Sequence, residues 1–190
     1  KLKEKIIEVH KRLSDQPAFS SFRYRIVCSD SVGISYFEEH SAIATFYLKN
    51  PTDSKKLPSL YHEMYEGDFS TVAPDVMVMK RYIFNGIRPM AFAMDMQSGI
   101  SKVRQEKVAS QVDRSLLGSS INFLLYEWMT TLNFSQLPTS FRTMKTNQVD
   151  ALLLSGTMDG RTYLKSGIEI AKKFENGQHV IIENGGHDLY

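Results

Sequence analysis

Hydrophobic residues at the start of the chain recur at the spacing of an α-helix. Leu2, Ile6, Val9 and Leu13 fall on one side of such a helix, and charged residues occupy the opposite side. This pattern predicts an amphipathic helix that buries its apolar face. Pro17 follows soon after, and because proline lacks a backbone N–H and clashes with the preceding turn, we expect it to stop the helix.

The sequence that follows favours β-strands. Residues 22–27 and 34–37 are rich in aromatic and β-branched side chains, and they flank the segment Ser29-Asp30-Ser31-Val32-Gly33. Short polar side chains and glycine are common in turns. We therefore predict a short hairpin whose turn lies at residues 29–33.

From residue 41 to about residue 132 the pattern predicts a succession of short helices. Asn50-Pro51 interrupts this region, and Leu57-Pro58 opens a helix that we expect to end near Gly67. Further helices are predicted over residues 71–81, 101–114 and 120–132, the last from the spacing of its apolar residues: Ile121, Leu124, Leu125 and Trp128. Residues 1–145 are thus predicted to form a mainly helical region with one small hairpin.

The pattern changes after Pro138. Residues 149–154 and 179–182 are almost continuous aliphatic runs, as in parallel strands buried on both faces, and residues 162–174 between them have helical spacing. Residues 146–190 therefore predict a β-α-β unit of the α/β class, with the carboxyl ends of both strands at one sheet edge. Since two strands are marginal alone, we expect further parallel strands beside this unit.

Asp159 and His187 each follow one of these predicted strands by about four residues. If the strands are neighbours, both side chains lie at the same sheet edge, where an aspartate can accept a hydrogen bond from a histidine ring. This is the acid and base part of a Ser-His-Asp triad, and the order Asp before His is that of α/β-hydrolases. The alternatives are that Asp159 caps the following helix and that His187 is an ordinary loop residue. Nearby glycines are expected to allow tight loops with positive φ.

The sequence lacks a G-x-S-x-G nucleophile motif. The segment most similar to this motif is Gly33-Ile34-Ser35-Tyr36-Phe37, which has a bulky phenylalanine where the motif needs a small residue. Ser35 is therefore predicted to be a hairpin residue. Cys28 is the single cysteine, with Asp30 close by, and is predicted to be structural. One cysteine excludes an intrachain disulfide and a multi-cysteine metal site. No metal and no cofactor are predicted.

Composition narrows the function classes further. Hydrophobic residues make up 42% of the 190 residues, and 23 Lys and Arg balance 21 Asp and Glu. Both signs of charge are interleaved, so nucleic acid is not an expected partner. No apolar run approaches the roughly 20 residues of a membrane span. These features do not indicate a cellular compartment for the protein.

Two segments resemble the C-terminal end of α/β-hydrolases of the tripeptidyl aminopeptidase and proline iminopeptidase group. They are Leu153-Leu154-Ser155-Gly156-Thr157-Met158-Asp159-Gly160-Arg161-Thr162 and Val180-Ile181-Ile182-Glu183-Asn184-Gly185-Gly186-His187. The sequences Leu57-Pro58-Ser59-Leu60-Tyr61-His62, Glu66-Gly67-Asp68-Phe69 and Leu125-Tyr126-Glu127-Trp128 resemble parts of that group's helical lid. The resemblance implies a lid over residues 1–145, followed by the last β-α-β of the core, with Asp159 and His187 catalytic.

The resemblance also implies an activity, and it implies that part of the protein lies outside this chain. The intact protein would be a serine peptidase that releases N-terminal residues or short peptides through an acyl-enzyme, with Asp95 binding the substrate amine. The alternative for Asp95 is a helix-capping or solvated residue. The N-terminal core with the serine would lie outside this chain, which alone would be inactive. An esterase, a hydrolase that uses aspartate as nucleophile, and a non-catalytic binding or assembly module derived from the lid are the alternatives.

Overall fold

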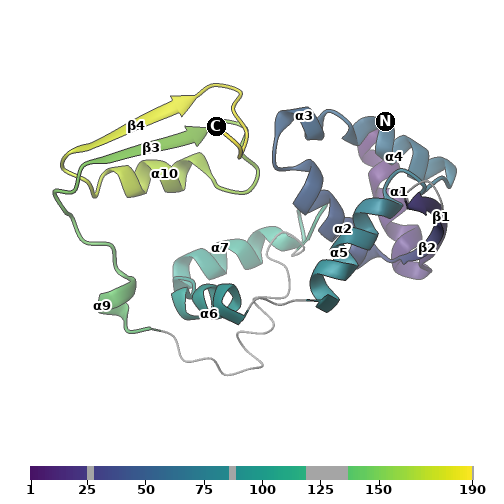
Figure 1. Ribbon diagram of the computed structural model, residues 1–190, viewed down its shortest axis with the longest axis horizontal. Coiled ribbons are helices and arrows are strands. Elements are labelled where there is room, and N and C mark those ends of the chain that lie inside the picture. Colours follow the sequence, from purple (N-terminus) through teal and green to yellow (C-terminus); the bar gives the residue numbers. More distant parts are fainter. Residues whose placement is uncertain (25–27, 86–88, 119–136, 190) are drawn as a thin grey trace. The chain divides into compact units, whose positions relative to one another are not determined.

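The computed structural model describes residues 1–24, 28–85, 89–118 and 137–189 (Figure 1). The chain divides into two compact units. The first comprises Lys1–Thr45 and Leu57–Gln136, and the second comprises Phe46–Lys56 and Leu137–Tyr190. The second unit is therefore built from two segments that lie far apart in the sequence.

Helix packing forms the core of the first unit. Helix α1 (Leu2–Asp15) packs against α4 (Leu57–Glu66), and α2 (Tyr36–Ala42) packs against α5 (Ala73–Asn85). The predicted first helix is confirmed, and Val9 and Leu13 on its apolar face are buried. Leu2, at the open end of the same face, is 39% exposed. Burial on this face therefore begins after the first turn.

The predicted hairpin is present, but its register was wrong. Strands β1 (Ala18–Tyr24) and β2 (Cys28–Ile34) are antiparallel, so residues 29–33 lie within a strand and not in a turn. Val32 and Ile34 alternate with Gly33 and are 4% and 0% exposed. Burial of these two side chains on one face of the hairpin stabilises residues 29–33 as part of a strand. This effect outweighs the preference of their polar residues and glycine for a turn. Residues 36 and 37, predicted as strand, instead begin α2.

The other helices of the chain are short. The predicted helices that begin at residue 57 and within 71–81 and 101–114 are confirmed, whereas the one predicted over 120–132 lies outside the described residues. Gly67, just after α4, has a φ of 94° and provides the left-handed residue that ends a helix. Other helices in the described part of the chain are the π-helix η1 (Ile43–Tyr47), α3 (Pro51–Ser54), α6 (Pro89–Ser98), α7 (Lys102–Val112) and α9 (Thr139–Arg142).

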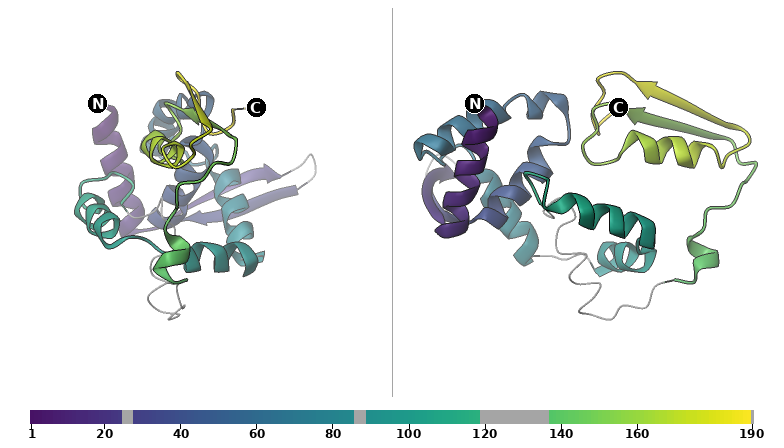
Figure 2. Two further views of the ribbon diagram at one scale, coloured as in Figure 1. Left: turned by 90° about the vertical axis from the view of Figure 1, so that its left-hand side faces the viewer. Right: turned by 180° about the vertical axis from the view of Figure 1, so that it is seen from behind.

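The second unit contains the predicted β-α-β. Strands β3 (Ala151–Gly156) and β4 (Gly177–Ile182) are parallel, and α10 (Leu164–Ala171) connects them and packs along one face of the sheet (Figures 1 and 2). The expectation that both faces are buried was wrong. Leu152, Leu154 and Val180 are 64%, 48% and 45% exposed, because α10 covers only the opposite face. This leaves an apolar sheet face open to solvent.

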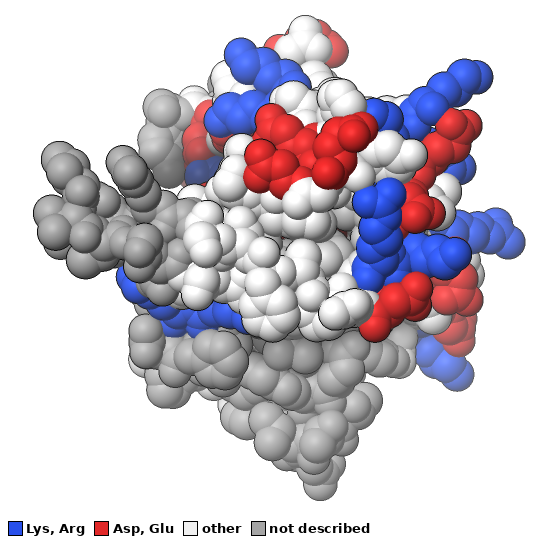
Figure 3. Space-filling model, turned by 90° about the vertical axis from the view of Figure 1, so that its right-hand side faces the viewer, with Lys and Arg blue, Asp and Glu red and all other residues white. Residues whose placement is uncertain are grey.

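Charged side chains of both signs are interspersed on the face of the molecule in Figure 3. Ion pairs among the described residues include Arg12 with Glu8 at 3.0 Å and Lys5 with Glu66 at 3.9 Å. None of the helices that the structure describes is long and apolar enough to cross a membrane.

Candidate active site

Two loops at the carboxyl edge of the parallel sheet carry the predicted catalytic pair. Asp159 lies three residues beyond the end of β3, and His187 lies five residues beyond the end of β4. Because the strands are adjacent and parallel, both loops leave the sheet at the same edge. The structure brings the two side chains into contact, as the spacing predicted.

The Asp159 carboxylate uses its two oxygens differently. Its Oδ2 lies 3.0 Å from Nδ1 of His187, and its Oδ1 accepts hydrogen bonds from the backbone N–H groups of Arg161 and Thr162 at 2.8 and 2.9 Å. The side chain is only 8% exposed. Asp159 is therefore the partner of the histidine and also binds the backbone of its own loop. The alternative that it caps the following helix was wrong, because the N-cap of α10 is Tyr163 and has no side-chain capping hydrogen bond.

These hydrogen bonds set the charge state of Asp159. Partial burial raises the pKa of the carboxyl, but the hydrogen bonds from Thr162, His187 and Arg161 outweigh it, so the net pKa lies below its usual value. Asp159 is therefore ionised near neutral pH, and it faces the histidine as a full negative charge.

An ionised Asp159 selects the tautomer of His187. The carboxylate only accepts hydrogen bonds, so Nδ1 of the neutral ring must carry the proton. The lone pair is then on Nε2, the nitrogen that can take a proton from a nucleophile. The His187 side chain is 34% exposed, which leaves the ring accessible.

Asn50, which sequence reasoning missed, holds the histidine loop. Its Oδ1 accepts the backbone N–H groups of His187 and Asp188 at 2.8 and 3.2 Å, and its Nδ2 donates to the Asp188 carboxylate at 2.9 Å. Lys49 adds a backbone carbonyl to the His187 N–H at 2.9 Å and an ion pair with Asp188 at 2.5 Å. Lys49, and then Asn50, hold the pKa of Asp188 below its usual value. Asn50 precedes His187 by 137 residues, so no local motif signals this contact.

Glycines allow these loops to approach one another closely. A Cβ on Gly160 would lie 2.2 Å from the backbone oxygen of Leu48, and one on Gly156 would lie 2.2 Å from that of Gly185. The expectation of positive φ at these glycines was wrong. Within the described chain, the positive-φ residue of these loops is Asn184, with a φ of 57°. The glycines are required for space, and Asn184 adopts the left-handed conformation that asparagine tolerates.

The other candidate residues lie in the first unit. Ser35 is not a hairpin residue, because it is the N-cap of α2 and both its hydroxyl and its backbone N–H contact the Glu38 carboxylate. Asp95 lies on α6 with an exposed side chain. Cys28 is the first residue of β2. The structure thus brings Asp159 and His187 together, while Asp95 belongs to the other compact unit.

Comparison with known proteins links the C-terminal third of the chain with one family model. Residues 126–190, about a third of the chain, match the α/β-hydrolase family model described as TAP-like protein. The match contains both Asp159 and His187, and it supports assignment of this part of the chain to the α/β-hydrolases. No curated protein and no solved structure matches the chain.

Proposed function

We propose that Asp159 and His187 are the acid and base of a serine hydrolase of the tripeptidyl aminopeptidase type. The observation that carries this proposal is the 3.0 Å contact between Asp159 Oδ2 and His187 Nδ1, at the carboxyl edge of a parallel β-α-β. Its support is the agreement of this geometry with the TAP-like family match over the same residues.

In this mechanism His187 accepts the proton of a serine nucleophile at Nε2 and later returns it to the leaving amine. Asp159 keeps the ring in the required tautomer and stabilises the imidazolium, without itself becoming protonated. Asn50 and Lys49 position the loop that carries the histidine. The acyl-enzyme forms on the serine and is then hydrolysed by water that His187 activates.

The serine belongs, in this proposal, to a segment of the protein outside these 190 residues. Two observations support this. The chain contains no nucleophile motif, and the sheet exposes an apolar face that includes Leu152, Leu154 and Val180. Further core strands and helices would bury this face, as they do in a complete α/β sheet. The 190-residue chain alone is therefore expected to be inactive.

The first unit serves as a lid over the substrate in this proposal, and peptides with a free N-terminus are the preferred substrates. An exposed carboxylate such as Asp95 can pair with the substrate ammonium group. Esters are the second substrate class, because the same acyl-enzyme chemistry cleaves them.

Active-site labelling of the natural protein tests this function. The polypeptide is captured from its source cells with an antibody raised against the 190-residue chain, and it is treated with a fluorophosphonate probe, which reacts with activated serines. We expect a labelled band heavier than 21.7 kDa, and loss of the label in His187→Ala. His179→Gln is the matched control, since His179 contacts Ser155 on β3 at 2.9 Å and takes no part in the proposed pair.

Two results would contradict the proposal: no label on the captured protein, or full labelling of His187→Ala. Substrate class is then read from tripeptide anilides with free or acetylated N-termini. Preference for the free amine supports the peptidase, and cleavage of nitrophenyl esters alone indicates an esterase.

A further inference from the structure

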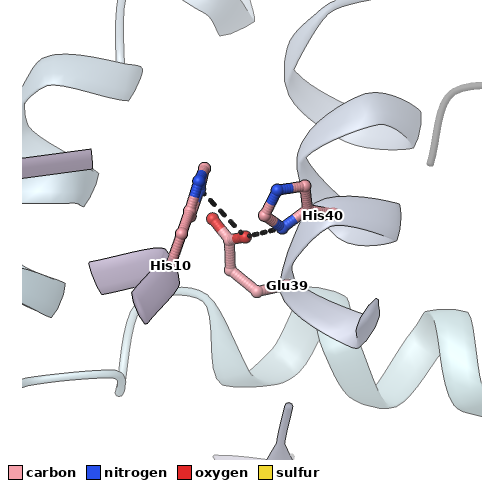
Figure 4. A group of neighbouring side chains, drawn as sticks. All are labelled: His10, Glu39 and His40. Atoms are coloured by element: carbon pink, nitrogen blue, oxygen red, sulfur yellow. Dashed lines mark ion pairs between the residues drawn. The ribbon is translucent and has the colours of Figure 1, made fainter. Parts of the chain in front are cut away.

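A second group of titratable side chains lies in the core of the first unit. His10 of α1 and Glu39 and His40 of α2 point toward one another (Figure 4). Glu39 Oε2 lies 2.6 Å from His40 Nδ1 and 3.5 Å from His10 Nε2. The three residues are 0%, 0% and 7% exposed, in the order Glu39, His40, His10. This cluster is separate from the pair formed by Asp159 and His187.

The hydrogen bond of His40 to the backbone fixes which of its nitrogens faces Glu39. His40 Nε2 lies 3.0 Å from the carbonyl oxygen of Leu116, and a carbonyl can only accept, so Nε2 carries a proton. In the neutral ring the lone pair is then on Nδ1, directly against a carboxylate oxygen at 2.6 Å. Two lone pairs repel at this distance, so a proton or a metal ion must lie between them.

The carboxylate needs more than one partner. Both Glu39 oxygens and His40 Nδ1 are buried and lack a well-directed hydrogen bond to any described residue. An ionised carboxylate without such partners is costly to bury. A proton on His40 Nδ1 would make a hydrogen bond to one Glu39 oxygen only. A metal ion within the cluster can contact the Glu39 carboxylate and the imidazoles of His10 and His40 together.

Aromatic rings enclose the cluster. The His40 ring lies 4.0 Å from the ring of His10 and 3.8 Å from that of Tyr36, centroid to centroid, and the Tyr61 hydroxyl lies 3.1 Å from His10 Nε2. The ion-pair partners of Glu39 that the structure describes are His10 and His40, and neither is a lysine or an arginine.

We propose that His10, Glu39 and His40 bind a divalent zinc ion. The three donor atoms all lie within 4.8 Å of one another, close enough for small side-chain adjustments to bring them to zinc–ligand distances of about 2.0–2.2 Å. Two imidazoles and one carboxylate suit zinc better than calcium or magnesium, which prefer oxygen ligands. The Leu116 carbonyl holds His40 as outer partners commonly hold zinc-bound histidines.

The burial of the site indicates a structural role. The ion would join α1 to α2, two helices that are also packed against one another. Because a bound metal stabilises only the folded state, zinc should raise the melting temperature of the chain.

Metal content and spectroscopy test the proposal on the purified 190-residue chain. After equilibration with zinc and dialysis, we expect one zinc per chain, and a melting temperature that falls when a chelator is added. Cobalt in place of zinc should give the visible spectrum of a four-coordinate site formed by two imidazole nitrogens, one carboxylate oxygen and a bound water. A thiolate charge-transfer band would instead indicate Cys28 and overturn the assignment.

Variants locate the ion. Glu39→Gln keeps the side-chain volume and should weaken zinc binding at least about tenfold, with the helical circular dichroism retained. His62→Ala is the matched control, because His62 lies on the surface 3.7 Å from Glu66 and offers a weak exposed site. Zinc below stoichiometry in the original chain, or zinc lost from His62→Ala and kept by Glu39→Gln, would overturn the proposal. If Glu39→Gln does not fold, the chelator and cobalt measurements on the unaltered chain decide alone.

Discussion

Asp159 holds His187 with one carboxylate oxygen while its other oxygen is bound to the backbone of its own loop. The histidine partner is therefore already oriented before any substrate arrives. Such preorganisation matters because a catalytic base must meet its proton donor within hydrogen-bond distance and in the correct tautomer. The geometry separates the two functions of the aspartate, which makes each of them testable.

Asp159→Asn should change the tautomer of His187 while leaving the loop folded. The amide oxygen can still accept from Arg161 and Thr162, which leaves the amide NH2 facing His187 Nδ1, where it can only donate. We expect the ¹⁵N chemical shifts of His187 to move to those of the tautomer protonated on Nε2, measured by two-dimensional NMR of the chain. In the proposed serine hydrolase the rate should fall by about 10⁴-fold, the loss expected for a Ser-His-Asp triad whose aspartate becomes asparagine. Asp150→Asn, on an exposed residue, should change neither quantity.

Acid should destabilise the second unit through Asp159. The folded-state pKa of this carboxyl lies below the unfolded value of about 3.9. The ionised form thus stabilises the fold above that value, and this contribution is lost as the pH falls through the folded-state pKa. Urea midpoints measured between pH 3 and 7 should drop at the acid end, and less so in Asp159→Asn. If the unaltered chain and Asp159→Asn lost the same stability at low pH, Asp159 would not be the cause of the acid sensitivity.

Asn50→Ala should loosen the histidine loop. The substitution removes the acceptor of the Asp188 N–H and one of the two acceptors of the His187 N–H, which keeps its bond to the Lys49 carbonyl. Losing hydrogen bonds of this kind costs about 0.5–1.5 kcal/mol each in unfolding free energy. Hydrogen exchange of the Asp188 amide should accelerate. Asn176→Ala removes one exposed side-chain hydrogen bond to the backbone of Gln148 and should have a smaller effect on stability and none on that amide.

Gly160→Ala should be more damaging than an ordinary glycine substitution. The new methyl group would lie 2.2 Å from the Leu48 backbone oxygen, so one of two backbone segments must move, at a cost of about 1–3 kcal/mol. Gly33→Ala is the control, since its methyl group would meet the ring of Phe19 at 3.2 Å, and Phe19 is 82% exposed and can move aside. Chemical denaturation measures both. Equal losses in the two variants would show that the close approach at Gly160 is not the cause.

The parts of this structure that sequence could predict are those with local causes. Aliphatic runs around one amphipathic helix predicted β3, α10 and β4, and the strand ends placed Asp159 and His187 at one edge. The hairpin register depended on burial of Val32 and Ile34, a tertiary effect that outweighed turn propensity. Asn50 and the cluster of His10, Glu39 and His40 join segments distant in the sequence, and their residue types carry no spacing signal. Those contacts could be found only from the folded chain.

Because the second unit is built from two segments that are distant in the sequence, the ribosome synthesises its two parts at different times. Asn50 leaves the ribosome 137 residues before His187, an interval of roughly 7–27 s at about 5–20 residues per second. During that time the described helices that lie between them in the sequence, α4 to α7, can fold first. The contact that orders the histidine is therefore among the last to form. If a protease cuts the chain between the two segments after folding, non-covalent contacts alone should keep Asn50 bound to the His187 loop. If the chain is cut before folding, the same contact must form between two separate molecules.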